Sequence, residues 1–136
     1  MSTDNRDLDW LLENLREQTP GLRHVLVSSR DGLKICRTAG LDEDRADQLA
    51  AIASGIQSLS LSASAEFGTG ISAGLSMVEF AGGLLLIVPA GAGAHMAAVA
   101  ADDADVGLVG HNMNELVERI GPFLSAAPRP PETSSA

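Results

Sequence analysis

Two glycine-rich segments are the parts of this chain that come closest to a phosphate-binding loop. They are Gly68-Thr69-Gly70 and Gly91-Ala92-Gly93-Ala94-His95. A loop of the GxxxxGK[ST] type needs a lysine that reaches the β- and γ-phosphates. The only lysine of the chain, Lys34, is distant from both segments. We therefore interpret both segments as tight turns and predict no nucleotide or other cofactor.

The side chains that serve most often in metal or nucleophilic chemistry are scattered. His24, His95 and His111 show no metal-ligand spacing, and a zinc site needs three or four converging ligands. Cys36 is the only cysteine, which excludes an internal disulfide and favours a small core residue. No serine lies in a GxSxG motif. We predict no catalytic residue and no metal; a small hydrolase using Ser29 or His95 is the weakest alternative.

Length and charge limit the possible partners. A chain of 136 residues fits one domain, which we place at 1–126, followed by a disordered proline- and serine-rich tail at 127–136. The net charge of −9 argues against nucleic acid and anionic membranes, which both need basic patches. Neither a signal peptide nor a membrane-spanning run is present in the sequence, so we expect a cytoplasmic protein.

Hydrophobic spacing and turn residues predict an α+β fold in the order α-β-β-α-β-β-β-α. An Asp-Gly pair, Asp31-Gly32, predicts a type I′ hairpin between the first two strands. Asp42 is placed to cap the long helix, and Asp102 or Asp103 to cap the last one. The predicted helices are 7–18, 42–67 and about 104–123, and the predicted strands are 24–29, 34–38, 71–80, 84–88 and 94–101.

The long helix has two different faces. Leu49, Ile52, Ile56, Leu59 and Ala63 recur at helical spacing and form an apolar face. Small residues with one leucine occupy the opposite face. Twenty-six helical residues span about 39 Å, whereas a seven-residue strand spans about 23 Å. The helix is therefore longer than the sheet it could cover, which favours a homodimer.

Two stretches are predicted to form the dimer interface. The first is the small-residue helix face, where Leu61 must be either exposed or covered by a partner; the alternative is a solvated surface. The second is the strand after the long helix, because a long edge strand without a partner invites aggregation. The predicted interface residues are Ser54, Ser58, Leu61, Ala65, Ser72, Gly74, Ser76, Val78 and Phe80.

Four segments in this order resemble the Roadblock/LC7 (MglB-like) family. They are Ser29-Arg30-Asp31-Gly32-Leu33, the long helix after Gly40-Leu41, residues 78–84 (VEFAGGL) and residues 102–109 (DDADVGLV). The resemblance covers about residues 7–124. It implies a five-stranded antiparallel sheet with the long helix on one face and the two terminal helices on the other. It also implies a homodimer built from the edge strand and the long helices.

The resemblance further implies function. Family members regulate or scaffold small GTPases without catalytic residues of a conventional kind, and the chain is similar to small actinobacterial Roadblock proteins encoded beside a sensor kinase and a Ras-like GTPase. We predict a non-enzymatic, homodimeric regulator that binds a small Ras-like GTPase and modulates its nucleotide state or location, with a sensor histidine kinase as a further candidate partner. The predicted partner-binding residues are Asp47, Gln48, Ala51 and Gln57.

Two alternatives remain at this stage. An arginine finger from Arg45 is conceivable, although family members generally do not supply one. The second alternative function is a small-molecule-sensing module, because domains of this size often hold a ligand between sheet and helix. An aromatic content of 3% and the absence of tyrosine argue against such a pocket.

Overall fold

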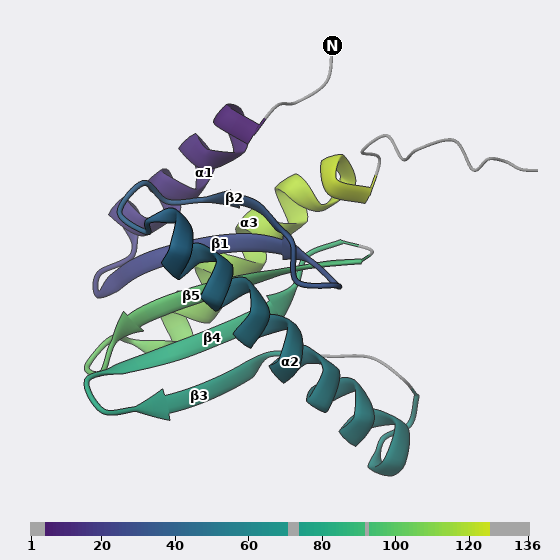
Figure 1. Cartoon of the computed structure of the whole chain (residues 1–136). Coiled ribbons are helices and arrows are strands. Elements are labelled where there is room, and N and C mark those ends of the chain that lie inside the picture. The colour runs from purple at the N-terminus through teal and green to yellow at the C-terminus, as the bar shows by residue number, and fades with distance from the viewer. Residues whose placement is uncertain (1–4, 71–73, 92, 126–136) are drawn as a thin grey trace, which may run out of the picture.

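A five-stranded antiparallel sheet between two helical layers forms the domain (Figure 1). The computed structural model describes residues 5–70, 74–91 and 93–125. The helices are α1 (Asn5–Gln18), α2 (Glu43–Phe67) and α3 (Val106–Ser125), and the strands are β1 (Leu22–Ser29), β2 (Lys34–Arg37), β3 (Ser76–Phe80), β4 (Gly83–Pro89) and β5 (Ala94–Ala101). The sheet order is β2-β1-β5-β4-β3, so the predicted element order and fold class are confirmed.

The central strands are buried on both faces. Leu26 of β1 pairs with Ala97 of β5, which pairs with Ile87 of β4. On one face, α1 and α3 cover a core that includes Leu12, Leu86, Met96 and Met113. On the other face, α2 covers a second core around Leu26, Ile87 and Ala97. Strand β4 is apolar without interruption because it is buried on both faces of the sheet. A strand of this kind needs helices on both faces, which is the arrangement observed.

Two local predictions are wrong. The turn after β1 closes by a hydrogen bond from Gly32 N–H to Ser29 O, so Arg30 and Asp31 are its central residues. Gly32 follows them with φ of +90°, which is typical of a three-residue loop rather than of a two-residue type I′ turn. The cap of α3 is Asp105, whose Oδ1 accepts from Leu108 N–H at 3.1 Å, and neither Asp102 nor Asp103.

The strand after α2 is shorter than predicted. It covers Ser76–Phe80, whereas Gly74 and Leu75 have no regular structure. Residues 71–73, with the predicted interface residue Ser72, lie outside the described residues. The start of α2 is as predicted, because Asp42 caps it and accepts from Arg45 N–H at 2.8 Å.

The face of α2 that packs on the sheet overlaps only in part with the predicted one, since Leu49 is buried in the core and Ile56 packs against it. The buried residues are Ala46, Leu49, Ala50, Ala53 and Gln57. Three alanines allow the helix backbone to lie close to the sheet, and the larger side chains therefore flank the contact instead of filling it. As a result, two members of the predicted apolar face, Ile52 and Leu59, are 51% and 71% exposed.

Candidate interaction site

Helix α2 presents one flank to the β1–β2 hairpin. Ser54 Oγ donates to Arg30 O at 2.8 Å, and Lys34 Nζ lies 2.6 Å from Asp47 Oδ1. Ser58, Leu61 and Ala65 follow Ser54 at helical spacing and lie along the same flank. We call it the hairpin flank; most of the predicted dimer seam lies here.

The opposite flank of α2 borders an apolar groove of about 440 Å³. Its floor contains Leu49, Leu85 and Val99, and its far wall contains Val78 and Phe80 of β3. We call it the α2–β3 groove. Its full lining is Arg23, His24, Leu41, Arg45, Gln48, Leu49, Ile52, Ile56, Val78, Phe80, Leu85 and Val99.

Large apolar side chains around this groove are exposed. Ile52 lines it at 51% exposed and Phe80 at 47%. Leu59 and Phe67 follow along α2, with Phe67 87% exposed. Met77 is exposed on the opposite face of β3, since its register partner Leu86 belongs to the core under α1 and α3. Apolar side chains concentrated in this way mark a surface that meets a partner.

One end of the groove is basic, although the whole chain is acidic. Arg23, His24 and Arg45 all line that end. Burial, together with the nearby Arg45 and Arg23 guanidinium groups, lowers the pKa of His24 below its ordinary value. Among the described residues, neither Arg23 nor Arg45 forms an ion pair with a carboxylate. This end of the groove therefore suits an acidic group of a partner.

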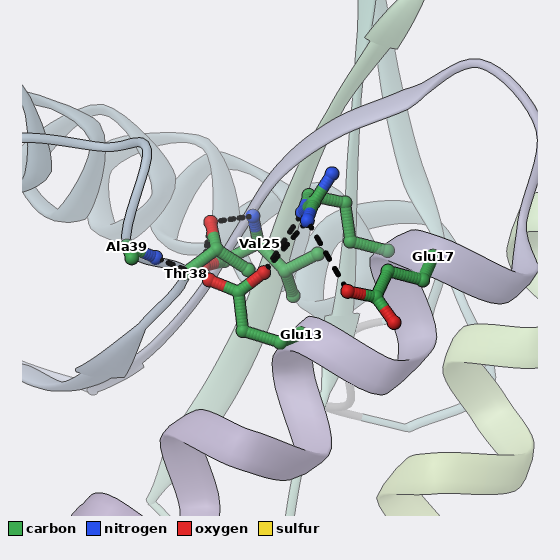
Figure 2. A network of polar contacts seen from close by, with 6 residues as sticks. Glu13, Glu17, Val25, Thr38 and Ala39 are labelled. Atoms are coloured by element: carbon green, nitrogen blue, oxygen red, sulfur yellow. Dashed lines mark hydrogen bonds and ion pairs between the residues drawn. The ribbon is translucent and has the colours of Figure 1, made fainter.

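The two edges of the sheet differ. At the β2 edge, Arg37 N–H donates to Asp9 Oδ1 at 2.9 Å, and Ala39 N–H donates to Glu13 Oε2 at 2.5 Å. The intervening Thr38 N–H points inward to Val25 O, and Figure 2 shows the Glu13 carboxylate at the neighbouring Ala39. Carboxylates of α1 therefore occupy the outward donors on either side of Thr38. At the other edge, β3 bonds to β4, and no other element in the described part of the chain pairs with it. The β3 edge is thus the one able to accept a strand.

Replacement of Glu13 tests whether its hydrogen bond to the β2 edge stabilises the fold. Its acceptance of the Ala39 N–H, with help from Arg16, lowers the pKa of Glu13 below 4.5. The stabilisation is therefore complete above pH 4.5 and is lost as the pH falls through the lower, folded-state value. We expect Glu13→Gln to be less stable than the parent at pH 7 and to lose less stability on acidification, measured by urea unfolding between pH 7 and pH 3. Equal pH profiles for the two proteins would contradict this, and Glu17→Gln is the control because Glu17 does not bond to the edge.

The predicted partner-binding residues are not all accessible. Asp47, Gln48 and Ala51 are exposed on α2, although Asp47 also pairs with Lys34. The placement of Gln57 on the exposed surface is wrong: it is 7% exposed, and its Oε1 accepts from Ser76 Oγ. The side chain of Gln57 instead makes a hydrogen bond that joins α2 to β3.

The residues considered for catalysis are not assembled into a site. Ser29 and His95 lie on opposite faces of the sheet, since Ser28, adjacent to Ser29, is the register partner of His95. Ser29 Oγ donates to Asp31, and His95 is buried. Cys36 is also buried, which raises the pKa of its thiol to about 12, so it is a core residue as predicted.

Among the helices that the structure describes, none is both long and apolar enough to cross a membrane.

The strand order, the two helical layers and the open apolar groove define a small interaction domain. The chain belongs to the Roadblock/LC7 family, whose domain model matches residues 8–100. It is 38% identical to a Roadblock/LC7 domain from Streptomyces avermitilis, with a TM-score of 0.83 over 90% of this chain and 98% of that one.

Two more distant structures share the fold. The gliding protein MglB from Thermus thermophilus is 18% identical, with a TM-score of 0.80 over 93% of this chain and 95% of that one. A structure described as MglB with tetrameric arrangement is 17% identical, with a TM-score of 0.79 over 90% and 91% of the two chains. A comparison with curated protein sequences gives no match. The predicted family and fold are confirmed by these findings.

Proposed function

We propose that this protein is a homodimeric, non-enzymatic regulator whose dimer forms at β3 and the α2–β3 groove. The observation that carries the proposal is the coincidence of the open sheet edge with the exposed apolar groove. Pairing of β3 with β3 of a second copy would satisfy its outward backbone groups. It would also join two five-stranded sheets into one sheet of ten strands, and a structure of the same fold is described in a tetrameric arrangement.

In this dimer, α2 of each copy covers the groove of the other. Leu59 and Phe67 supply apolar side chains for the groove, and Glu66, next to Phe67 on an exposed stretch, supplies a carboxylate for its basic end. The flank of α2 that borders the α2–β3 groove therefore forms the helical part of the dimer interface. The sequence pattern had predicted that part at Ser54, Ser58, Leu61 and Ala65 instead. Of the predicted strand residues, Val78 and Phe80 line the groove and are retained in the proposal.

The hairpin flank then remains available for a second partner. Asp47 and Ala51 are exposed there, whereas Gln48 lines the α2–β3 groove. The family resemblance favours a small Ras-like GTPase as that partner, bound in the cytoplasm so that one of its switch conformations is stabilised. A sensor histidine kinase is the second candidate partner. No reacting group is required of this chain, since binding alone shifts the equilibrium of the GTPase.

The experiment that tests GTPase binding compares nucleotide states. Purified small GTPases, loaded separately with GDP or with a GTP analogue, are tested for capture by the immobilised dimer. We expect one nucleotide state to bind at least about tenfold more tightly, which corresponds to about 1.4 kcal/mol. Ala51→Arg should abolish capture, whereas Asn114→Arg, on the exposed side of α3, should not. Failure of both nucleotide states to bind would count against the GTPase proposal.

A small-molecule-sensing module is the second candidate function. Its support is the volume of the groove, about 440 Å³, which lies within the range of ligand-binding pockets. Its apolar lining ends at two arginines, so an anionic amphiphile is the class of ligand to test. A rise in melting temperature with such a ligand, in the absence of any GTPase, would favour this function over dimerisation at the groove.

A further inference from the structure

Two buried polar side chains lie opposite each other on the α2 face of the sheet. Ser28 of β1 and His95 of β5 are direct register partners. Ser28 follows Leu26 by two residues and His95 precedes Ala97 by two, so both side chains lie on the α2 face of the sheet with those residues. Opposed residues in antiparallel strands have Cβ atoms about 5 Å apart, so the two polar groups are neighbours.

Both groups are enclosed. Ser28 is fully buried and His95 is 4% exposed. Ser28 Oγ and His95 Nε2 have no hydrogen-bond partner among the described residues. Buried polar groups of this kind are costly and uncommon, because most find a partner. These two unpartnered groups therefore weaken the contact between the middle of α2 and the sheet, relative to a contact made by alanines alone.

Among the described residues, no charged group contributes to the pKa shift of His95 and could compensate a proton there. The buried residues in the middle of α2 are Ala50, Ala53 and Gln57, and none of them titrates. From β4, its register partner is Pro89. The charged residues of the adjoining hairpin turn, Arg30 and Asp31, are exposed. Burial alone lowers the pKa of His95 below its ordinary value of 6.5.

The other titratable group on this face of β1 lies farther along the strand. His24 is four residues before Ser28, next to Arg45 at the start of α2, and its pKa is lowered as well. Its protonation acts on the first turns of α2. The middle of the helix, residues 50–57, makes both the Ser54–Arg30 bond and the Gln57–Ser76 bond, and it contains two of the alanines that pack on the sheet, Ala50 and Ala53.

We propose that Ser28 and His95 form an acid-sensitive latch that controls how the middle of α2 sits on the sheet. With His95 neutral, α2 closes over both side chains. A protonated His95 presents two N–H donors and a charge to a buried site where its register partner offers one hydroxyl, so water must enter and the helix must lift. The latch is a property of one protomer, and it holds whether or not the α2–β3 groove forms a dimer.

The pH range of the effect follows from the direction of the shift. An unfolded or opened chain binds a proton at His95 below about pH 6.5, whereas the closed chain resists it. The opening equilibrium should therefore increase about tenfold for each pH unit below 6.5, until the lower folded-state pKa is reached.

Amide hydrogen exchange, corrected for the intrinsic effect of pH, measures this opening. Between pH 7.5 and pH 5, we expect protection of residues 50–57 to fall in the parent protein, by at most about thirtyfold, because the effect begins below about pH 6.5. We expect His95→Gln to remove this dependence, whereas His111→Gln, at an exposed position on α3, should retain it. His24→Gln should alter residues 43–48 and leave the dependence at 50–57 unchanged. Protection at 50–57 that is independent of pH in the parent would overturn the proposal.

A second measurement uses the unaltered protein, in case His95→Gln does not fold. The imidazole resonances of the three histidines and the amide resonances of α2 are followed by NMR from pH 7.5 to pH 5. We expect the amides of residues 50–57 to shift with the same midpoint as His95. A midpoint shared with His24 or His111 instead would assign the acid response to another histidine and overturn the latch.

Discussion

Ile52→Glu converts the proposed dimer into a monomer. Ile52 is 51% exposed in one protomer and lines the groove, so the substitution leaves the core intact and places a carboxylate where a second copy would exclude water. An unpaired charge buried at an interface costs several kcal/mol, and two-fold symmetry introduces it twice. We expect the dissociation constant to rise at least about 100-fold, which corresponds to about 2.7 kcal/mol. Light scattering and analytical ultracentrifugation at micromolar protein measure the change.

The same helix provides a matched comparison for Ile52→Glu. Leu61 lies on the hairpin flank, almost opposite Ile52 and Leu59 around α2. If the groove flank forms the interface, Leu61→Glu leaves the dimer intact and Leu59→Glu weakens it. Ser58→Glu, exposed on the hairpin flank, should have no effect and controls for added negative charge. A monomeric Leu61→Glu beside a dimeric Ile52→Glu, with both proteins folded by circular dichroism, would transfer the interface to the hairpin flank.

Leu86→Ala lowers the free energy of unfolding by about 3 kcal/mol. Leu86 is fully buried in β4, with Met96, Met113 and Leu12 in the same core. Truncation removes buried methyl groups and leaves a cavity that the neighbouring strands cannot fill, because both helical layers hold them in place. Since a domain of this size has about 5–15 kcal/mol of stability in total, the loss is a large fraction. Urea unfolding followed by circular dichroism measures it.

An exposed leucine provides the control for this substitution. Leu33, in the hairpin, is 66% exposed, and Leu33→Ala should change stability by no more than about 0.5 kcal/mol. A loss below about 1 kcal/mol for Leu86→Ala would show that the core around β4 is less tightly packed than its burial indicates. If the protomer and dimer unfold together, both variants are compared at one protein concentration.

The periodicity of the chain was sufficient to predict its helices and strands, but not which face of α2 contacts the sheet. Strand burial is readable in the sequence because residues 84–88 are apolar without interruption, and a strand of that kind needs cover on both faces. For α2, hydrophobicity favoured Ile52 and Leu59 as sheet contacts, yet close approach by Ala46, Ala50 and Ala53 decided the orientation. Side-chain volume at the contact outweighed hydrophobicity, and a single sequence does not reveal which of the two dominates.

The candidate site was only partly predictable for the same reason. Val78 and Phe80 were predicted at the strand edge, and the structure places both in the groove wall. The basic end of the groove was missed because Arg23 and Arg45 are 22 positions apart and meet only after β1 and α2 are packed together. Gln57 and the Ser28–His95 pair were missed because burial of a polar residue has no local sequence signal. The bonds of Asp9 and Glu13 to the β2 edge were also missed, because they join α1 to residues that lie 28 and 26 positions further along the chain.

The carboxylates of Asp9 and Glu13 have a consequence for the stoichiometry of any assembly built by strand addition. A sheet with two receptive margins can polymerise without limit, as cross-β fibrils do. Here one margin is already occupied by side chains of its own α1, so growth that begins at β3 ends after the second molecule. In the proposed dimer, the two acidic residues that bond to the β2 edge would therefore also prevent growth into a filament.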